Sequence, residues 1–132
     1  MSDATQVVQA ELVAALSGNG ALAAAVSGVF DGPPARVAFP YLVISDGATS
    51  DWGFKGGSGR EHRLEVTVWD DGQSPNRLQG LVAEVEAAIE GLPVDLDGHR
   101  LVSIVHLRSR LIRSADGPWS GRVAYRARTI AG

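Results

Sequence analysis

Residues 39–70 contain two strand-like runs separated by a long polar loop, and this arrangement constrains the fold more than any other part of the chain. The first run, 41–45, is aromatic and β-branched and directly follows Pro40. In the second run, Leu64, Val66 and Val68 alternate with polar neighbours, which is the period of a half-buried strand. The two runs therefore predict strands of a sheet.

The connection between these runs, residues 47–59, is rich in Gly and Ser and longer than the roughly two to five residues that a hairpin needs. Long loops of this kind often bind a partner. Trp52 lies in this loop and Trp119 in a later turn, where the sequence offers no obvious core position. Large aromatic side chains at such places are typical of protein interfaces, with a lid folded over the core as the alternative. We expect the loop to contact a partner.

Three helices are predicted. The first begins after Asp3, which is placed to cap it, and ends at the Gly-Asn-Gly sequence 18–20. A short second helix is expected at 21–26, and residues 28–40, with their prolines, are expected to be an extended connector without regular structure. Ser74 and Pro75 give the third helix a cap and a first residue. Its apolar stripe consists of Leu78, Leu81, Val82, Val85, Ala88, Ile89 and Leu92.

Two long strands are predicted near the end of the chain, at residues 100–113 and 121–130. Strict alternation in the first puts Leu101, Ser103, Val105, Leu107, Ser109 and Leu111 on one face and Val102, Ile104, His106, Arg108, Arg110 and Ile112 on the other. In the second strand Arg122, Ala124, Arg126 and Arg128 share a face. Paired as a hairpin, the two strands gather several arginines on one face. Such charges repel one another unless solvent, ions or an acidic partner relieves them.

These elements predict an α+β fold, with a mostly antiparallel sheet packed against two or three helices in a single domain over residues 1–132. The chain contains no cysteine, so neither disulfides nor thiolate metal sites are available. Its apolar stretches are far shorter than the roughly 20 residues that span a membrane, and its N-terminus lacks the pattern of a secretory signal. We expect a protein made in the cytoplasm, with no membrane partner.

The charge of the chain is unevenly distributed. Residues 1–99 carry 5 basic and 14 acidic side chains, whereas residues 100–132 carry 7 arginines and a single acid, Asp116. This asymmetry is typical either of a nucleic-acid surface or of an acidic surface that meets a basic one on a neighbouring subunit. We favour a protein partner, because the basic segment lacks the lysine clusters and interleaved aromatic residues of a dedicated nucleic-acid binder.

The sequence contains no convincing catalytic, cofactor-binding or metal-binding pattern, so we expect no enzyme, no cofactor and no metal. The Gly-rich segment 53–59 lacks the Gly-Lys-Ser/Thr order of a phosphate-binding loop. The histidines His62, His99 and His106 do not have the spacing that places two imidazoles on one metal. Ser58 and Ser120 each lie beside a glycine but not in a nucleophile elbow.

Short segments along almost the whole chain form one recognisable series. The series begins with the Ala-rich first helix containing Leu12-Val-Ala-Ala-Leu, the stretch from Val29-Phe30 to Phe39-Pro-Tyr-Leu-Val-Ile, and the Ser50-Asp-Trp loop before Glu61-His-Arg-Leu-Glu-Val-Thr-Val-Trp. The series continues with the amphipathic third helix. It ends with two further segments, Gly98-His-Arg-Leu-Val and Gly121-Arg-Val-Ala-Tyr-Arg-Ala-Arg. In order and spacing these segments resemble the phage tail completion family, also described as tail terminator or head–tail joining proteins.

The resemblance implies an α+β structural protein of a tailed phage or phage-like particle, located in the virion at the neck end of the tail. It further implies a ring of identical copies, a hexamer, which terminates the tail tube and joins it to the head-side connector, with DNA passing through the lumen. By this resemblance, Asp51, Trp52 and Lys55 contact an adjacent subunit or the tube protein. Arg108, Arg110, Arg126 and Arg128 face an acidic partner or the lumen. The alternative is a nucleic-acid-binding module that uses the C-terminal arginine-rich strands.

Overall fold

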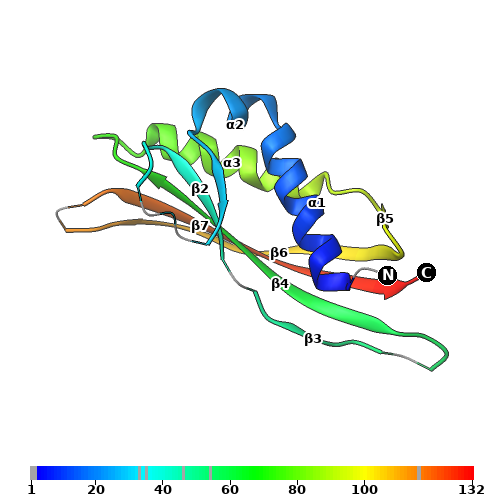
Figure 1. The fold of residues 1–132 in the computed structure, drawn as a ribbon. Coiled ribbons are helices and arrows are strands. Elements are labelled where there is room, and N and C mark those ends of the chain that lie inside the picture. The colour runs from blue at the N-terminus through cyan, green and yellow to red at the C-terminus, as the bar shows by residue number, and fades with distance from the viewer. Residues whose placement is uncertain (1–2, 33, 35, 46, 54, 116) are drawn as a thin grey trace.

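Three helices lie on one face of a curled sheet in the computed structural model, which describes residues 3–32, 34, 36–45, 47–53, 55–115 and 117–132 (Figure 1). Within those residues the helices are α1 (Ala4–Gly18), α2 (Gly20–Ala25) and α3 (Asn76–Glu90). The strands are β1 (Val29–Asp31), β2 (Tyr41–Ser45), β3 (Thr49–Asp51), β4 (Gly59–Asp70), β5 (Asp95–Leu96), β6 (His99–Arg113) and β7 (Trp119–Ala131). The predicted α+β class is confirmed.

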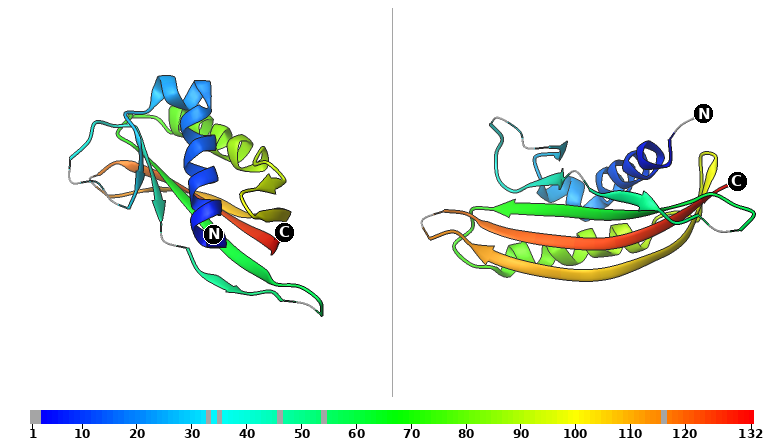
Figure 2. Two further views of the ribbon diagram at one scale, coloured as in Figure 1. Left: turned by 45° about the vertical axis from the view of Figure 1, so that its right-hand side comes forward. Right: turned by 90° about the horizontal axis from the view of Figure 1, so that it is seen from below.

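The sheet is built around three long strands. Its order is β1-β2-β4-β7-β6-β5, and β3 also pairs with β4. β4 pairs with β7 from Gly59, opposite Ile130, to Asp70, opposite Trp119. In the described part of the chain β1 and β2 are parallel to each other, whereas every other strand pair is antiparallel. Figure 2 shows the long strands curving together, with β6 along one rim of the sheet and the β3–β4 hairpin extending past α1.

The core lies between the helices and one face of the sheet. The stripe predicted for α3 is confirmed in its main members, because Leu78, Leu81, Val82, Val85 and Ile89 are buried. α1 contributes Val7, Val8, Leu12 and Leu16. The sheet contributes Leu42, Ile44, Leu64, Val66, Val68, Val123, Tyr125 and Ala127. Since strand side chains alternate between faces, these residues also determine which ones lie on the face without helices.

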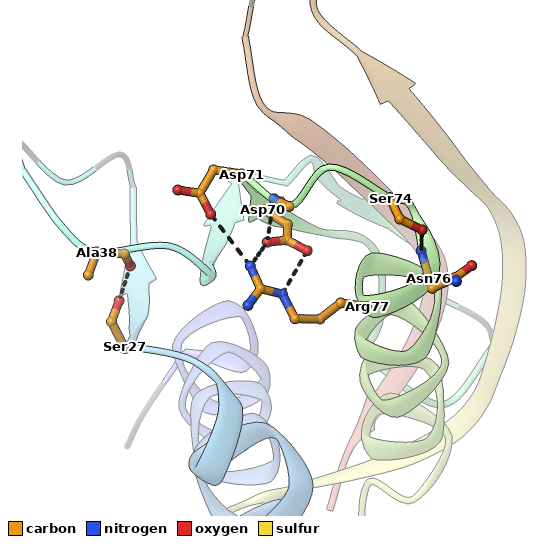
Figure 3. Close-up of polar contacts among 8 residues, drawn as sticks. Ser27, Ala38, Asp70, Asp71, Ser74, Asn76 and Arg77 are labelled. Carbon is orange, nitrogen blue, oxygen red and sulfur yellow. Dashed lines mark hydrogen bonds and ion pairs between the residues drawn. The ribbon is translucent and has the colours of Figure 1, made fainter.

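The entry into α3 is held by an ion pair (Figure 3). Asp70, at the end of β4, has a fully buried carboxylate; Arg77 Nε donates to its Oδ2 at 3.0 Å and Arg77 Nη2 donates to its Oδ1. Hydrogen bonding from Arg77 outweighs burial and holds the pKa of Asp70 below its ordinary value. The predicted start of α3 is wrong by one residue, because Pro75 occupies the N-cap position rather than the first helical one; Ser74 Oγ still accepts a hydrogen bond from the Asn76 N–H at 3.2 Å.

The predicted cap of α1 is only partly correct. Asp3 occupies the N-cap position, but its side chain makes no capping hydrogen bond. Its backbone carbonyl accepts from the Val7 N–H at 3.0 Å instead. The short second helix is confirmed at Gly20–Ala25, where Asn19 supplies the cap: its Oδ1 accepts from the Leu22 N–H at 3.0 Å.

Short strands lie where the sequence predicted none. β1 falls within the predicted connector 28–40 and pairs with β2, while β3 falls within the predicted loop 47–59 and pairs with β4. β5 replaces part of the turn expected before residue 100. Each has two or three residues, too few to show a two-residue period, and all three residues of β3 are exposed. The first part of the predicted loop, residues 48–52, is therefore one arm of a hairpin.

No helix among the described residues combines the length and the apolar character needed to cross a membrane.

Candidate interaction surface

The sheet face opposite the helices is rich in arginine. Residues directly opposite each other in antiparallel strands share a face. Arg110 lies opposite Arg122, Val105 opposite Arg126, and Arg63 also opposite Arg126. We define the arginine face as Arg63, Arg100, Arg108, Arg110, Arg122, Arg126 and Arg128. On the same face β4 contributes two acids, Glu61 and Glu65. The predicted gathering of arginines on one side of the hairpin is thus confirmed.

Two irregularities in β6 decide which of its residues belong to this face. The pairing of β6 with β7 shifts between Leu101 and Ser103 and again between His106 and Arg108. Between these bulges the strict alternation predicted from the sequence is wrong. Ile104 and His106 lie opposite helix-side Ala127 and Tyr125, whereas Ser103 and Val105 lie opposite Arg128 and Arg126. The second bulge restores the original alternation, so Arg108 and Arg110 lie on the predicted side.

Three of the predicted site residues come together toward the tip of the β3–β4 hairpin, where it lies beside β7. The guanidinium carbon of Arg128 lies 4.9 Å from the centroid of the Trp52 ring, a cation–π distance. Arg128 Nε donates to Glu61 Oε1 at 3.0 Å, and Arg126 Nε lies 3.9 Å from the same oxygen. Trp52, Glu61, Arg126 and Arg128 form what we call the Trp52 cluster. Arg126 Nε is buried in it without a hydrogen-bond partner among the described residues.

Gly59 makes room for this cluster. The Trp52 N–H donates to the Gly59 carbonyl at 3.0 Å, which continues the hairpin beyond β3. A Cβ on Gly59 would lie 2.5 Å from the Trp52 carbonyl oxygen and 3.0 Å from the Trp52 ring. The ring thus packs on the arginine face rather than over the hydrophobic core, which rules out a lid over that core.

The other predicted site residues are dispersed. Asp51 pairs with Arg60 at 3.1 Å within the hairpin, and Lys55 is exposed near its tip. Arg108 and Arg110 are exposed on β6. Trp119, which the sequence left between interface and lid, packs partly buried against the core, with the Arg113 guanidinium carbon 5.4 Å from its ring centroid.

Two hollows mark the arginine face. One, of about 460 Å³, has Arg63, Glu65, Leu107 and Arg108 in its lining, together with Gly47 and Ala48. The other, of about 340 Å³, lies beside Tyr41, Trp69 and Arg122. Both include Glu65 in their walls, so they adjoin each other.

Arg63 and Arg122 line these hollows but were not among the predicted site residues. The alternation of Arg63 with Leu64 indicates that Arg63 lies on the face opposite the core. It does not indicate which strands pair beside Arg63, so the sequence could not place it next to the arginines of β7.

His62 is buried on the helix side of the hairpin. Its Nδ1 lies 3.3 Å from Thr49 Oγ1 and its Nε2 lies 2.9 Å from Thr129 Oγ1, so it links β3, β4 and β7. Burial lowers the pKa of His62 below its ordinary value of 6.5 and favours the neutral ring. The residue therefore holds the hairpin to the sheet.

Polar contacts between α3 and β6 do not form a catalytic triad. Ser109 Oγ donates to Glu86 Oε2, and His106 Nε2 lies 2.8 Å from Ser109 Oγ and 3.3 Å from Glu86 Oε2. In a triad the carboxylate binds the ring nitrogen that does not face the serine. Here Glu86 and Ser109 share one nitrogen, so the contacts tie the helix to the sheet. In the described part of the chain no three His, Asp or Glu side chains are grouped to hold a metal ion.

Comparison with known proteins identifies the family. Residues 10–130 match the family model of the tail completion protein gp17. The chain belongs to this family. Family membership makes it a structural protein of a phage tail or phage-like particle, located in the virion. The resemblance inferred from the sequence is confirmed. No curated protein matches the chain.

Solved structures agree with the family assignment. A chain from the virion of a native gene transfer agent particle superposes with a TM-score of 0.72 at 25% identity, covering 98% of this chain and 95% of that one. The gp17 protein of bacteriophage SPP1 superposes with a TM-score of 0.67 at 23% identity, covering 94% and 89% respectively. At that identity the second match establishes the shared fold.

Proposed function

We propose that this protein forms a ring of identical subunits, a hexamer, that terminates the tail tube and joins it to the head-side connector. The observation that carries the proposal is the family match over residues 10–130. The likeness to a chain of a gene transfer agent virion, which extends over 98% of this chain, supports it. The protein acts as a structural, non-catalytic component. Its partners are its own copies, the tube protein and the connector, and DNA passes through the lumen.

The surfaces of the subunit suit this role. A ring built head to tail needs two different surfaces on each subunit. The hairpin tip, with exposed Asp51 and Lys55, extends past α1, where it can reach a neighbour or the tube (Figure 1). The arginine face is left uncovered by the helices, and its Arg108 and Arg110 are exposed. In our proposal this face lines the lumen or meets an acidic partner.

Deleting the gene tests the function directly. Particles made without this protein are expected to yield headless tails, many of them overlong, beside filled heads without tails, because nothing stops tube growth or bridges to the connector. Negative-stain electron microscopy of the lysate measures this, with the wild-type gene supplied in trans as the control. Joined particles with tails of normal length in the deletion would contradict the proposal.

DNA binding is the second candidate, and the arginine face is what favours it. That side of the sheet carries seven arginines together with the glutamates Glu61 and Glu65. Binding of duplex DNA by such a face depends steeply on salt, because each phosphate contact releases counterions.

A matched pair of variants tests DNA binding. If the face binds DNA, Arg110→Gln is expected to weaken retention of duplex DNA and to reduce the slope of log affinity against log salt by about 1. Arg113→Gln removes the same charge from the other side of the sheet, where Arg113 lies opposite Trp119 of β7, and should leave the slope unchanged. Equal effects of the two variants would show that DNA is attracted by the overall charge of the protein and not bound by the arginine face. No binding at physiological salt would remove this candidate.

A further inference from the structure

One rim of the sheet is open over most of a long strand. β5 pairs with His99 and Arg100, and the Leu101 N–H donates to the Val94 carbonyl at 2.7 Å. From Val102 to the end of β6, no described strand pairs with its outer edge. Figure 2 shows this strand as the rim of the sheet. An edge strand presents unpaired backbone donors and acceptors, which are a template for another strand.

Apolar side chains gather along the same rim. Among the described residues, five large hydrophobic side chains are exposed: Phe39, Val94, Val102, Val105 and Leu107. Three of these belong to the open part of β6, and Val102 and Leu107 lie at its two bulges. Native sheets usually protect a free edge with charges, prolines or a covering loop. The arginines and the two bulges of β6 protect this edge in part, but its exposed Val102, Val105 and Leu107 are typical of an edge that acquires a partner.

A strand that suits this rim lies on the opposite side of the same subunit. The segment from Ala48 to Trp52 bonds to β4, because Ala48 accepts from the Arg63 N–H and the Trp52 N–H donates to Gly59. In the described part of the chain its other edge has no strand partner, and all of β3 is exposed. β3 carries one acid, Asp51, and no basic residue, whereas β6 carries four arginines and no acid. Because Arg60 already pairs with Asp51 at 3.1 Å, the fit between the two edges rests on their free backbone groups rather than on charge.

We propose that β3 of one subunit adds to the open edge of β6 of the next, so that the sheets of neighbouring copies join edge to edge. The inference rests on the proposed ring and names its interface. Because the two edges lie at opposite rims of one sheet, the contact is head to tail, which is the kind that generates a ring when rotation closes it.

The strand directions support this junction. β3 runs antiparallel to β4, β4 to β7, and β7 to β6. A second copy placed as a continuation of the sheet therefore brings its β3 antiparallel to β6, which is the slightly more stable ladder. Continuation also keeps the arginine face of every copy on the same side. Ser50, which lies opposite Glu61, belongs to that side, as do Ser103 and Val105.

Disulfide cross-linking in assembled particles tests the junction. The chain has no cysteine, so every thiol is an introduced one. Ser50→Cys is co-expressed with Ser103→Cys, Val105→Cys or Arg110→Cys in cells that produce the particles, and purified particles are oxidised. Three positions are used because a disulfide needs Cα atoms about 5.5–6 Å apart and the register is not fixed beforehand. The control replaces Ser50→Cys with Gln79→Cys, an exposed residue of α3.

The expected result is a covalent dimer that contains Ser50→Cys and at least one of the β6 variants, with none in the Gln79→Cys control. If the protein is present in the particles but no pair links, the edge junction is wrong while the proposed function stands. Self-linking of Val105→Cys alone would show β6 paired with β6, and linking to another virion protein would show a different occupant; either overturns the inference. Absence of the wild-type protein from particles would instead refute the proposed function.

Discussion

Replacing Asp70 with Asn is expected to lower the free energy of unfolding by about 2 kcal/mol at neutral pH. The Asp70 carboxylate is fully buried, and its hydrogen bonds to Arg77 are charge-assisted (Figure 3). Arg77 is half exposed, so the arginine left behind is partly rehydrated and the loss is smaller than for a pair buried on both sides. Urea denaturation of the purified protein measures the effect.

Asp71→Asn is the matched control. Asp71 also pairs with Arg77, at 3.5 Å, but its side chain is 60% exposed. Removing its charge should cost under about 0.5 kcal/mol, as for other surface pairs. A loss equal to that of Asp70→Asn would show that burial of the carboxylate is not the cause.

The pH dependence has a defined sign. The pKa of Asp70 is lower in the folded protein than its ordinary value of 3.8. The stability that this carboxylate contributes is therefore fully present above that value and is lost as pH falls through the lower folded pKa. The difference in stability between wild type and Asp70→Asn should shrink in acid below pH 3.8. A difference that stays constant in that range would contradict this account.

Gly121→Ala is expected to destabilise the protein by about 1–3 kcal/mol, the usual cost of overpacking a core. Gly121 lies in β7 directly beneath α3. A Cβ there would be 2.5 Å from Val82 Cγ2 and 3.3 Å from Leu78 Cδ1. Both side chains are buried, so the helix has to move away from the sheet to admit the methyl group. Thermal or urea unfolding measures the loss.

A double-mutant cycle separates this clash from a general effect of alanine in a strand. Val82→Ala alone removes buried methyl groups and is destabilising. In the Gly121→Ala background the same change also removes the clash, so its cost should be smaller. The expected coupling is about 0.5–3 kcal/mol in the favourable direction. Additive effects would show that Val82 does not limit the approach of α3 to Gly121.

The sequence predicted the long, strongly periodic elements well. The stripe of α3 and the alternation around Leu64 each repeat several times, so they identify both the element and its buried side. The short strands β1, β3 and β5 were missed, because two or three residues show no period and their pairing is decided by the strands beside them. The family could be inferred because its signal extends over the whole chain rather than over one motif.

The gathering of arginines on one face was predictable from the sequence, but the contacts that these arginines make were not. Alternation placed Arg126 and Arg128 on one face, yet their contacts with Glu61 depend on the pairing of β4 with β7, between residues far apart in the chain. The position of Trp52 over Arg128 depends on the hairpin that β3 completes. Such contacts follow from topology, which the local pattern of side chains does not encode.

The two bulges of β6 constrain how the length of this strand can change. Each bulge adds one unpaired residue and reverses the alternation beyond it. If the chain length stays the same, straightening a single bulge would turn one end of the strand over, exchanging Arg108 and Arg110 with Ser109 and Leu111 or carrying Leu101 out of the core. Loss of both together would leave both ends as they are. A one-residue deletion at Val102 or Leu107 instead removes a bulge and leaves every other residue of the strand on its present side, so these two positions are where related chains can differ in length by one residue.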